Sequence, residues 1–353
     1  MNQKNKIKVL VVDDSALIRQ TLISIISSNE NMEVIASASD PYAAVNKMKS
    51  EKPDVITLDI QMPRMDGLTF LKKIMSQHPI PVVIISSLTQ KESELALSAY
   101  KLGAISVIEK PTFSSGLLQQ QWKEKLEDAI LTAANSRLQK FKLKSHSIAK
   151  VSKKIIKKPH NKKKCNSFIF IGSSAGGTEA INNILSKLDG DTPPILIVQH
   201  MPVQFTASYA KRLDNNSQLT VREAISGDEL YRGLALVAPG DKHMEFNNNG
   251  FSYFADLNSD AKVNRHRPSV DVLFNSVLKF KGINIMAIIL SGMGNDGSAG
   301  MLELKRIGAT TIAQNSESSI VYGMPKEAFR IGAATYSLSI NEIIEKINNF
   351  SKK

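Results

Sequence analysis

Short apolar segments alternate with amphipathic segments along the first third of the chain. The apolar segments predict buried strands, because they are four to eight residues long and bounded by Gly, Pro and small polar residues. They cover Ile7–Asp13, Met32–Ser37, Val55–Ile60, Pro81–Ser86 and Ala104–Lys110. The intervening patterns, such as Ser15–Ser27 and Lys91–Leu102, predict helices. A strand–helix repeat of this kind indicates an α/β domain with a doubly wound parallel sheet.

The same alternation returns after a polar interval near the middle of the chain. Its predicted strands are Ile169–Ser173, Ile195–Gln199, Leu234–Ala238 and Ile285–Leu290. Helical patterns lie between or after them, at Thr178–Leu188, Val270–Lys279 and Ser298–Ile307. We therefore expect a second doubly wound α/β domain, Rossmann-like in its general plan.

Length and composition agree with two intracellular domains. The chain has 353 residues, of which 42% are hydrophobic, and two ordinary cores are the natural expectation for that length. Cys165 is the single cysteine, so no intrachain disulfide forms and a reducing compartment, the cytoplasm, is expected. The first residues lack the apolar core of a signal peptide, and no apolar run is long enough to span a bilayer. We expect a protein that is neither secreted nor membrane-embedded.

The formal charge of +12 belongs almost entirely to one segment. Residues 139–164 hold eleven lysines and no acidic residue, so the rest of the chain carries a net charge of only +1. The segment lacks sustained apolar periodicity, and we interpret it as a Lys-rich, self-repelling linker. A solvated tether is one reading, and attraction to an acidic partner surface is another. Nucleic-acid binding is not expected, since no nucleic-acid-binding motif accompanies the lysines.

Polar residues cluster at the ends of the predicted strands in the first domain. They are Asp13 and Asp14 after the first strand, Asp59 in the third, Ser86 at the end of the fourth and Lys110 in the fifth. Because the carboxyl ends of parallel strands share one edge, these side chains are expected to meet. Three carboxylates repel one another and need a counter-charge, and hard oxygen ligands suit a hydrated Mg²⁺.

Four motifs make the region from Ile7 to Trp122 resemble the response-regulator receiver domain, which has a flavodoxin-like fold. They are Val11-Val-Asp-Asp-Ser15, Leu58-Asp-Ile-Gln-Met-Pro-Arg-Met-Asp-Gly67, Ser86 and Glu109-Lys-Pro111. The resemblance implies that Asp59 accepts a phosphoryl group from a sensor histidine kinase. It also implies that Asp13, Asp14 and Asp59 bind Mg²⁺ and that Ser86 and Lys110 contact the phosphoryl oxygens. We place the receiver at residues 5–125 and the linker at 126–165, Lys-rich from 139.

Three polar residues of the second domain also follow separate predicted strands, each in a short turn. Ser174 lies in Gly172-Ser-Ser-Ala-Gly-Gly-Thr178, His200 in Gln199-His-Met-Pro202 and Asp296 in Ser291-Gly-Met-Gly-Asn-Asp-Gly297. A nucleophile, a base and an orienting acid that converge at one sheet edge are typical of acyl transfer. The residues alone leave open whether Ser173 or Ser174 is the nucleophile.

These turns, with three further motifs, make residues 166–350 resemble the CheB methylesterase domain. The further motifs are Ala238-Pro-Gly-Asp-Lys-His-Met244, Asn264-Arg-His-Arg-Pro-Ser-Val-Asp271 and Val321-Tyr-Gly-Met-Pro-Lys-Glu-Ala328. The resemblance implies hydrolysis of glutamyl methyl esters on methyl-accepting chemotaxis receptors, and deamidation of receptor glutamines. It selects Ser174 as nucleophile, with His200 as base, Asp296 as orienting acid and the Met293 N–H as oxyanion donor. Ester hydrolysis of this type needs no cofactor.

The sequence departs from these families at two positions. Val107 stands three residues before Lys110, where receivers often carry an aromatic residue, so an aromatic rotamer switch is not inferred. Ala175 stands where the methylesterase family more often has Thr, which removes a hydroxyl beside the nucleophile.

Four other residues of the second domain remain candidates for secondary roles. His243 and His266 are either second bases or ordinary surface or hydrogen-bonded histidines. Arg265 and Arg267 either bind an acidic receptor helix or form loop-stabilising ion pairs with Asp260 or Asp271.

Two other classes of protein compete with the hydrolase interpretation. The turn after Phe168–Gly172 could bind a dinucleotide in an oxidoreductase, but its spacing fails the G-x-G-x-x-G template. A receiver with a basic tail could be a transcription factor, which the length of the second α/β domain argues against. A CheB-like regulator of another receptor pathway, or a catalytically weak receptor-binding scaffold, is a third alternative. The favoured reading is a chemotaxis enzyme that a CheA-like kinase phosphorylates and that is recruited to receptor clusters at the inner membrane.

Overall fold

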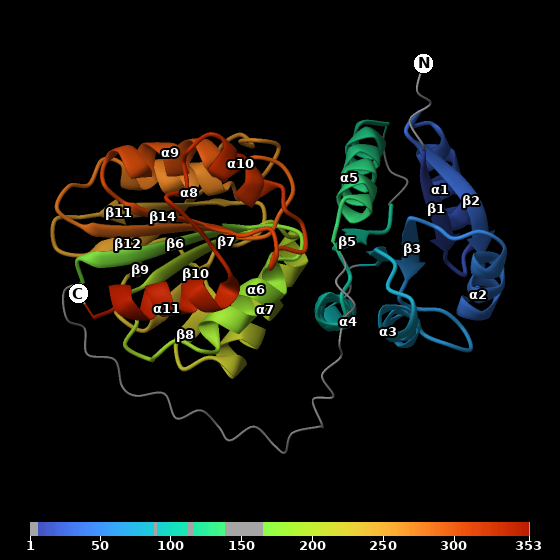
Figure 1. The fold of residues 1–353 in the computed structure, drawn as a ribbon, viewed down its shortest axis with the longest axis horizontal. Coiled ribbons are helices and arrows are strands. Elements are labelled where there is room, and N and C mark those ends of the chain that lie inside the picture. Colours follow the sequence, from blue (N-terminus) through green and yellow to red (C-terminus); the bar gives the residue numbers. More distant parts are fainter. Residues whose placement is uncertain (1–5, 88–89, 112–115, 138–164, 353) are drawn as a thin grey trace. The chain divides into compact units, whose positions relative to one another are not determined.

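The computed structural model describes residues 6–87, 90–111, 116–137 and 165–352, which fall into two compact units. The described residues of the first unit end at residue 137, and those of the second begin at residue 165 (Figure 1). The predicted Lys-rich linker, from residue 139 to 164, lies outside the described residues.

The N-terminal unit is a five-stranded parallel sheet with the strand order β2-β1-β3-β4-β5, surrounded by helices. Its strands are β1 (Ile7–Val12), β2 (Met32–Ala38), β3 (Val55–Asp59), β4 (Val82–Ser86) and β5 (Ser106–Glu109). Its helices are α1 (Ala16–Ser27), α2 (Pro41–Ser50), α3 (Gly67–Gln77), α4 (Gln90–Lys101) and α5 (Gly116–Ala134). The five predicted strands and both predicted helices are confirmed, with boundaries that differ by at most two residues.

Side chains at the helix starts explain where three of these helices begin. Ser15 accepts the N–H of Ile18 at the start of α1, and Asp66 accepts the N–H of Thr69 at the start of α3. Asp40 accepts two backbone N–H groups of α2, whose first residue is Pro41. Each cap lies directly after a strand or its loop, so the chain turns into a helix at once.

Helix α5 extends the N-terminal unit beyond the expected boundary at residue 125. Its residues Leu126, Ile130 and Ala133 are fully buried, and the helix contacts β3, β4 and β5. The helix therefore belongs to the first unit as far as Ala134, and the segment expected as linker begins later than residue 126.

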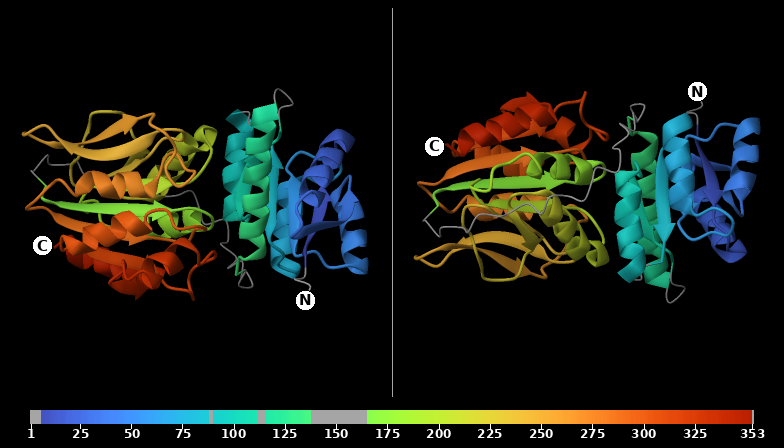
Figure 2. Two further views of the ribbon diagram at one scale, coloured as in Figure 1. Left: turned by 90° about the horizontal axis from the view of Figure 1, so that it is seen from above. Right: turned by 90° about the horizontal axis from the view of Figure 1, so that it is seen from below.

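The C-terminal unit is built on a seven-stranded parallel sheet with the order β15-β14-β13-β6-β7-β10-β8. The strands are β6 (Ser167–Ser173), β7 (Ile195–Gln199), β8 (Thr220–Glu223), β10 (Leu234–Val237), β13 (Asn284–Ile289), β14 (Thr310–Gln314) and β15 (Tyr336–Leu338). The helices are α6 (Gly177–Leu185), α7 (Val203–Asn216), α8 (Val270–Val277), α9 (Ser298–Arg306), α10 (Met324–Arg330) and α11 (Ile340–Phe350). Figure 2 shows these helices on both faces of the sheet. The predicted doubly wound architecture is confirmed.

A small antiparallel sheet in this unit was not predicted from the sequence. It joins β9 (Asp228–Glu229), β11 (His243–Asn248) and β12 (Tyr253–Asn258) in the order β11-β12-β9. The Phe246 ring meets the rings of Phe168 and Phe170 edge-on, at centroid distances of 4.8 Å and 5.4 Å. These aromatic contacts attach the small sheet to the centre of the large one.

The strand order places a topological switch at β6. The chain continues from β6 to β7 on one side, and returns much later to pair β13 on the other side. In open parallel sheets, the crevice for a ligand lies at the carboxyl ends of the strands next to such a switch. The turns that follow β6, β7 and β13 are therefore brought to one place.

Candidate functional site

The predicted acidic cluster of the N-terminal unit is present at the carboxyl edge of its sheet. One carboxylate oxygen from each of Asp13, Asp14 and Asp59 lies within 4.8 Å of the others. The ammonium of Lys110 is 2.7 Å from Asp59 Oδ2 and 3.1 Å from Asp13 Oδ2. Ser86 ends β4, is buried, and donates its hydroxyl to the carbonyl of Ser87.

These acids have little hydrogen-bond support. Burial raises the pKa of Asp59 to about 6, although the hydrogen bond and charge of Lys110 act in the opposite direction. Burial lowers the pKa of Lys110, but its contacts with Asp59 and Asp13 outweigh burial and raise it overall. Among the described residues, Asp13 Oδ2 has only this ion pair and no well-oriented hydrogen bond. Three carboxylates near a single ammonium group leave negative charge uncompensated, and their hard oxygen atoms are ligands that suit Mg²⁺.

The loop after Asp59 is held in place by a glycine and an ion pair. The N–H of Gly67 donates to the carbonyl of Ile60 at 2.8 Å, and a Cβ atom at position 67 would lie 2.0 Å from the Asp59 carbonyl oxygen. Arg64, with φ of 69°, forms an ion pair with the buried carboxylate of Asp40. Only glycine at position 67 allows α3 to begin this close to Asp59.

Two adjacent serines at the end of β6 have different environments. The Ser173 hydroxyl is fully buried and donates to Oε1 of Gln199 at 2.5 Å. Ser174 is partly exposed in the turn before α6, and its N–H donates to the carbonyl of Ser291. Gly177, at the start of α6, has no room for a Cβ atom because Ser173 and Gln199 lie against it. Ser173 is thus a packed structural hydroxyl, and Ser174 is the serine that a substrate can reach.

Gln199 connects the turn of Ser174 to the strand that carries His200. Its side-chain amide donates to the carbonyl of Ser174 at 2.9 Å and to the carbonyl of His200 at 3.1 Å. The His200 N–H donates in turn to the carbonyl of Ser173. Gln199 was not singled out from the sequence, where its signal is a polar residue at the end of an apolar strand.

The imidazole of His200 is paired with the carboxylate of Asp296. Nε2 of His200 lies 2.8 Å from Oδ2 of Asp296, and both side chains are buried. Nδ1 of His200 is buried and has no hydrogen-bond partner among the described residues. With Nε2 held by the acid as an N–H donor, Nδ1 is the nitrogen that is able to accept a proton.

Asp296 receives an unusual number of hydrogen bonds for one carboxylate. Besides His200, its donors are Asn264 Nδ2 at 2.8 Å, Ser269 Oγ at 2.7 Å, the Val270 N–H at 2.7 Å and the Asp271 N–H at 3.2 Å. Burial alone would raise its pKa, but the hydrogen bonds from His200, Asn264 and Ser269 hold it well below the usual range. Asp296 therefore stays ionised and in one orientation.

The loop that contains Met293 lies directly against the turn of Ser174. A Cβ atom on Gly292 would be 2.9 Å from Cβ of Ser174, so the backbone before Met293 approaches the turn of Ser174 closely. The Ser291 hydroxyl donates to the carbonyl of Ala175 at 2.8 Å and accepts the Val321 N–H. Ser291 thus connects the Met293 loop to the turn of Ser174 by hydrogen bonds.

The two secondary histidines have different roles in the structure. His243 is buried: its Nε2 lies 3.0 Å from the Ala261 carbonyl and its Nδ1 accepts the Ser269 N–H. The ring of His266 stacks on that of His200 with a centroid distance of 3.7 Å and an interplanar angle of 11°. Burial, and the positive charge that His200 would carry, lower the pKa of His266 to about 3. His243 is a structural residue, and His266 is an uncharged ring at the site.

The two candidate arginines also differ. Arg267 donates to Asp241 Oδ1 and to the carbonyls of Ser259 and Asp260, so it supports its own loop. Of the expected partners, Asp260 contributes only its carbonyl, and Asp241 supplies the carboxylate. Arg265 is exposed at the tip of a turn beside His266.

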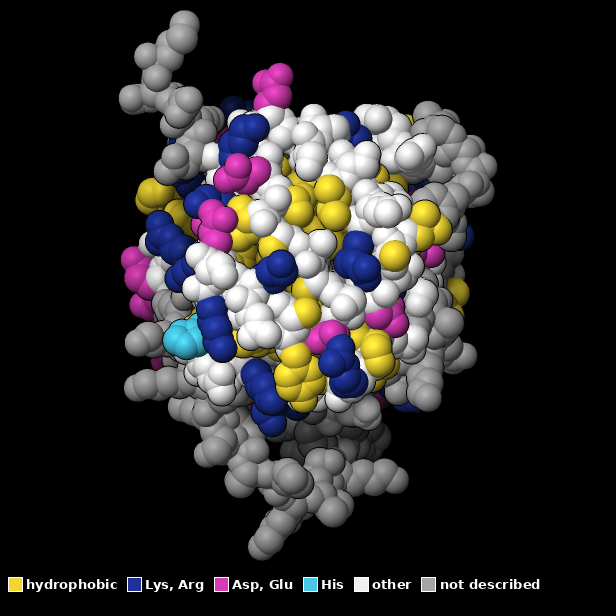
Figure 3. Space-filling view, turned by 90° about the vertical axis from the view of Figure 1, so that its right-hand side faces the viewer, with side chains coloured by type: hydrophobic (Ala, Val, Ile, Leu, Met, Phe, Trp, Pro, Cys, Tyr) yellow, Lys and Arg dark blue, Asp and Glu magenta, His cyan; other side chains and the backbone are white. Residues whose placement is uncertain are grey.

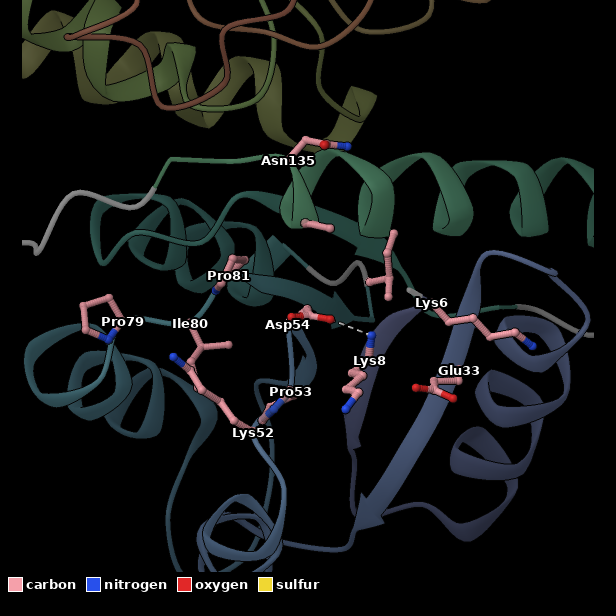
Figure 4. Close-up of a pocket in the computed structure, with 12 residues that line it drawn as sticks. Lys6, Lys8, Glu33, Lys52, Pro53, Asp54, Pro79, Ile80, Pro81 and Asn135 are labelled. Atoms are coloured by element: carbon pink, nitrogen blue, oxygen red, sulfur yellow. Dashed lines mark hydrogen bonds between the residues drawn. The ribbon is translucent and has the colours of Figure 1, made fainter. Parts of the chain in front are cut away.

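A separate hollow in the N-terminal unit lies at the opposite edge of its sheet, away from Asp59 (Figure 4). It has a volume of about 730 Å³ and is bordered by the starts of β1, β3 and β4 and the end of α5. Three lysines and two acids contribute to its lining, and the backbone N–H of Lys8 donates to Asp54 at 2.9 Å. The face of this unit in Figure 3 likewise mixes basic, acidic and apolar side chains.

Among the described helices, none combines the length and apolar character of a membrane span.

Family models match both parts of the chain. Residues 9–121 match the response regulator receiver domain, and residues 169–347 match the CheB methylesterase family. A protein-glutamate methylesterase/protein-glutamine glutaminase of Geobacter metallireducens is 45% identical over 348 residues, which are 97% of this chain and 98% of that protein. A protein of the same name from Oleidesulfovibrio alaskensis is 44% identical, with 97% of each chain covered.

A solved structure matches the C-terminal unit. The CheB methylesterase catalytic domain of Thermotoga maritima is 40% identical, with a TM-score of 0.50, and the match covers 52% of this chain and 97% of that domain. Sequence and fold comparisons thus agree on the C-terminal unit.

Proposed function

Because this chain belongs to the CheB methylesterase family and carries a response regulator receiver domain, we propose that it is a phosphorylation-regulated serine hydrolase of chemotaxis receptors. Its substrates are glutamyl methyl esters on methyl-accepting receptors, which it hydrolyses to glutamate and methanol. It also deamidates particular receptor glutamines to glutamate, as the names of its relatives indicate. The pairing of His200 with Asp296 beside the accessible Ser174 is the observation that carries the proposal.

The chemistry follows from the protonation states at the site. Ser174 attacks the ester carbonyl while Nδ1 of His200 takes its proton, and Asp296 stabilises the resulting imidazolium through Nε2. The Met293 N–H donates to the developing oxyanion. His200 then gives the proton to the departing methoxy oxygen, which leaves as methanol, or to the departing amide nitrogen of a glutamine, which leaves as ammonia. Water releases the acyl group in a second cycle of the same kind.

Regulation is assigned to the acidic cluster of the receiver. Asp59 accepts a phosphoryl group from a CheA-like histidine kinase, and Asp13, Asp14 and Asp59 would hold the Mg²⁺. When bound, the ion neutralises charge that develops on the transferring group. Lys110 and Ser86 contact the phosphoryl oxygens, since both lie at the same strand edge as Asp59.

The setting is the cytoplasmic side of receptor clusters at the inner membrane. Of the two arginines proposed for acidic receptor surfaces, Arg265 is the exposed one, whereas the bonds of Arg267 favour the loop-stabilising alternative. Arg265 is therefore the residue that we propose for substrate contact.

The test measures methanol release from methylated receptor membranes, with and without a small-molecule phosphodonor. Wild type is expected to release methanol faster with the phosphodonor, and Ser174→Ala to release none in either condition. Asp59→Asn keeps the slow basal release but loses the stimulation. No release by a phosphorylated wild type would contradict the hydrolase proposal, and equal basal losses in the two variants would contradict this division of roles.

A further inference from the structure

A tight two-residue turn lies beside the catalytic pair. Val263 and His266 exchange both backbone hydrogen bonds, with N···O distances of 3.1 Å and 2.9 Å. Between them, Asn264 and Arg265 both have left-handed backbone, with φ values of 51° and 67°. Such a turn suits asparagine at its first position, whereas a long side chain at its second position is disfavoured. The backbone conformation of Arg265 is thus unfavourable by itself, and contacts of the neighbouring residues stabilise the turn.

The asparagine of this turn lies between two buried carboxylates. Its side-chain nitrogen is 2.7 Å from Asp271 Oδ2 and 2.8 Å from Asp296 Oδ1. Both acids are buried, and Asp271 accepts a further hydrogen bond from the Gly300 N–H at 2.7 Å. An NH₂ group supplies two hydrogens, so one amide satisfies one oxygen of each acid.

The last residue of the turn contacts the other member of the pair. The near-parallel stack of His266 on His200 covers one face of the catalytic imidazole. Because Asn264 and His266 are two residues apart in one rigid turn, the same backbone fixes a contact to the acid and a contact to the base.

From this geometry we infer that the turn Val263–His266 positions the catalytic pair, with Asn264 orienting Asp296 and the flat ring of His266 orienting His200. Neither residue exchanges a proton with the substrate. The inference rests on the hydrolase proposal and adds two positioning residues to its triad. It gives Asn264 a role that the sequence did not suggest, and it assigns His266 a packing role against His200 instead of the role of a second base.

Asn264→Gly separates the amide from the backbone. Glycine adopts left-handed backbone freely, so the turn is kept while the contacts to Asp271 and Asp296 are lost. A hydrogen bond to a charged group contributes enough that its loss is expected to lower kcat by about 10- to 100-fold. KM for methylated receptor is expected to stay within about twofold, because the amide acts on the acid and not on the substrate. The rate at which a fluorophosphonate labels Ser174 should fall by the same factor as kcat.

Two substitutions at position 266 distinguish packing from acid–base chemistry. His266→Phe keeps a flat ring and is expected to retain kcat within about threefold, whereas His266→Ala removes the stack and lowers kcat further. Equal losses in both variants would overturn the packing role, because a proton-transferring imidazole is lost equally in each.

Ser217→Ala is the control for a simple loss of stability. Ser217 is buried at the far end of α7, donates to the Leu185 carbonyl and accepts the Leu219 N–H, so the variant loses two hydrogen bonds away from the site. It should lower the thermal midpoint without changing kcat. If Asn264→Gly keeps the kcat of wild type, the inference is wrong and the hydrolase proposal stands. A wild type without Ser174-dependent activity would instead refute the proposed function.

Discussion

The two parallel sheets carry buried acids at the same kind of edge but support them in opposite ways. In the N-terminal unit, Asp59 is paired with one lysine, and burial raises its pKa to about 6. In the C-terminal unit, Asp296 accepts hydrogen bonds from two side chains, an imidazole and two backbone N–H groups, and its pKa is held low. Burial acts on both carboxyls in the same direction, so the donors decide the difference.

This difference matches what each acid is proposed to do. A carboxylate that must bind a cation and accept a phosphoryl group needs oxygens that are not already saturated. A carboxylate that must stay charged while its neighbour gains and loses a proton needs fixed donors on every side. The carboxyl edge of a parallel sheet can therefore hold a carboxylate with free oxygen atoms or a carboxylate saturated by hydrogen bonds. The number of surrounding donors decides which.

The largest expected effect on catalysis comes from removing the negative charge of Asp296. Asp296→Asn keeps the side-chain shape but presents an amide to Asn264 and Ser269, and it no longer stabilises a His200 imidazolium. We expect kcat for methanol release to fall by roughly 10³- to 10⁴-fold. Circular dichroism checks that the variant is folded, and a loss below tenfold would show that His200 does not depend on this acid.

The next effect concerns the stability of the receiver. Because the pKa of Asp59 is raised in the folded state, that state binds a proton more tightly than the unfolded chain, and the Asp59 contribution becomes less favourable as pH rises from about 4 to about 6. Asp59→Asn should therefore stabilise the receiver at pH 7, by at most about 3 kcal/mol, with the gain vanishing below pH 4.

Trp122 allows this change to be measured in the full chain. It is the single tryptophan, and its indole donates to the Glu109 carbonyl within the N-terminal unit, so its fluorescence during urea unfolding reports on the receiver. An Asp59→Asn variant that is less stable than wild type at pH 7 would contradict a raised pKa of Asp59 in the folded state. So would a gain in stability that persists unchanged at pH 4.

A smaller effect is expected for cation binding. Mg²⁺ should alter the fluorescence of Trp122, because the ion competes with Lys110 for Asp13 and Asp59 and Glu109 adjoins that lysine. Asp13→Asn removes one of three carboxylates and should weaken Mg²⁺ binding by about tenfold, which corresponds to about 1.4 kcal/mol. Unchanged affinity would place the ion elsewhere, and Asp54→Asn at the opposite edge of the sheet is the matched control.

The smallest effect separates the two adjacent serines. Ser173→Ala loses a buried hydrogen bond to Gln199 and should cost about 1 kcal/mol of stability while leaving kcat within a few-fold of wild type. Denaturant unfolding and methanol release measure the two quantities on the same samples. If Ser173→Ala abolished activity and Ser174→Ala did not, the assignment of the nucleophile would be reversed.

The sequence was most informative where strands are continuous and apolar. All five receiver strands and the central strands of the second sheet were predicted, because fully buried parallel strands are short apolar runs. The residues that follow such strands could be named as candidates for the same reason. Strands β11 and β12 were missed because polar residues such as Glu245 and Asp256 interrupt their apolar pattern, although the two strands pair as neighbours in the sequence.

The supporting residues could not be predicted from the pattern. Gln199 and Asn264 act through side-chain amides whose partners lie on separate loops, and only the folded structure brings them together. The stack of His266 on His200 is equally non-local, since 65 positions of sequence separate two rings that share a plane-to-plane contact. The proposed reacting residues could be located because they follow strand ends. The residues that orient them could not, because their contacts form only in the tertiary structure.

The late pairing of β13 with β6 has a consequence for how the enzyme is made. Ser174 and His200 leave the ribosome long before Asp296, whose strand β13 begins at Asn284. A nascent chain that ends before Asn284 contains the nucleophile and the base but neither the acid nor the neighbouring strand that carries it. Such a chain therefore lacks the carboxylate that the proposed mechanism pairs with His200.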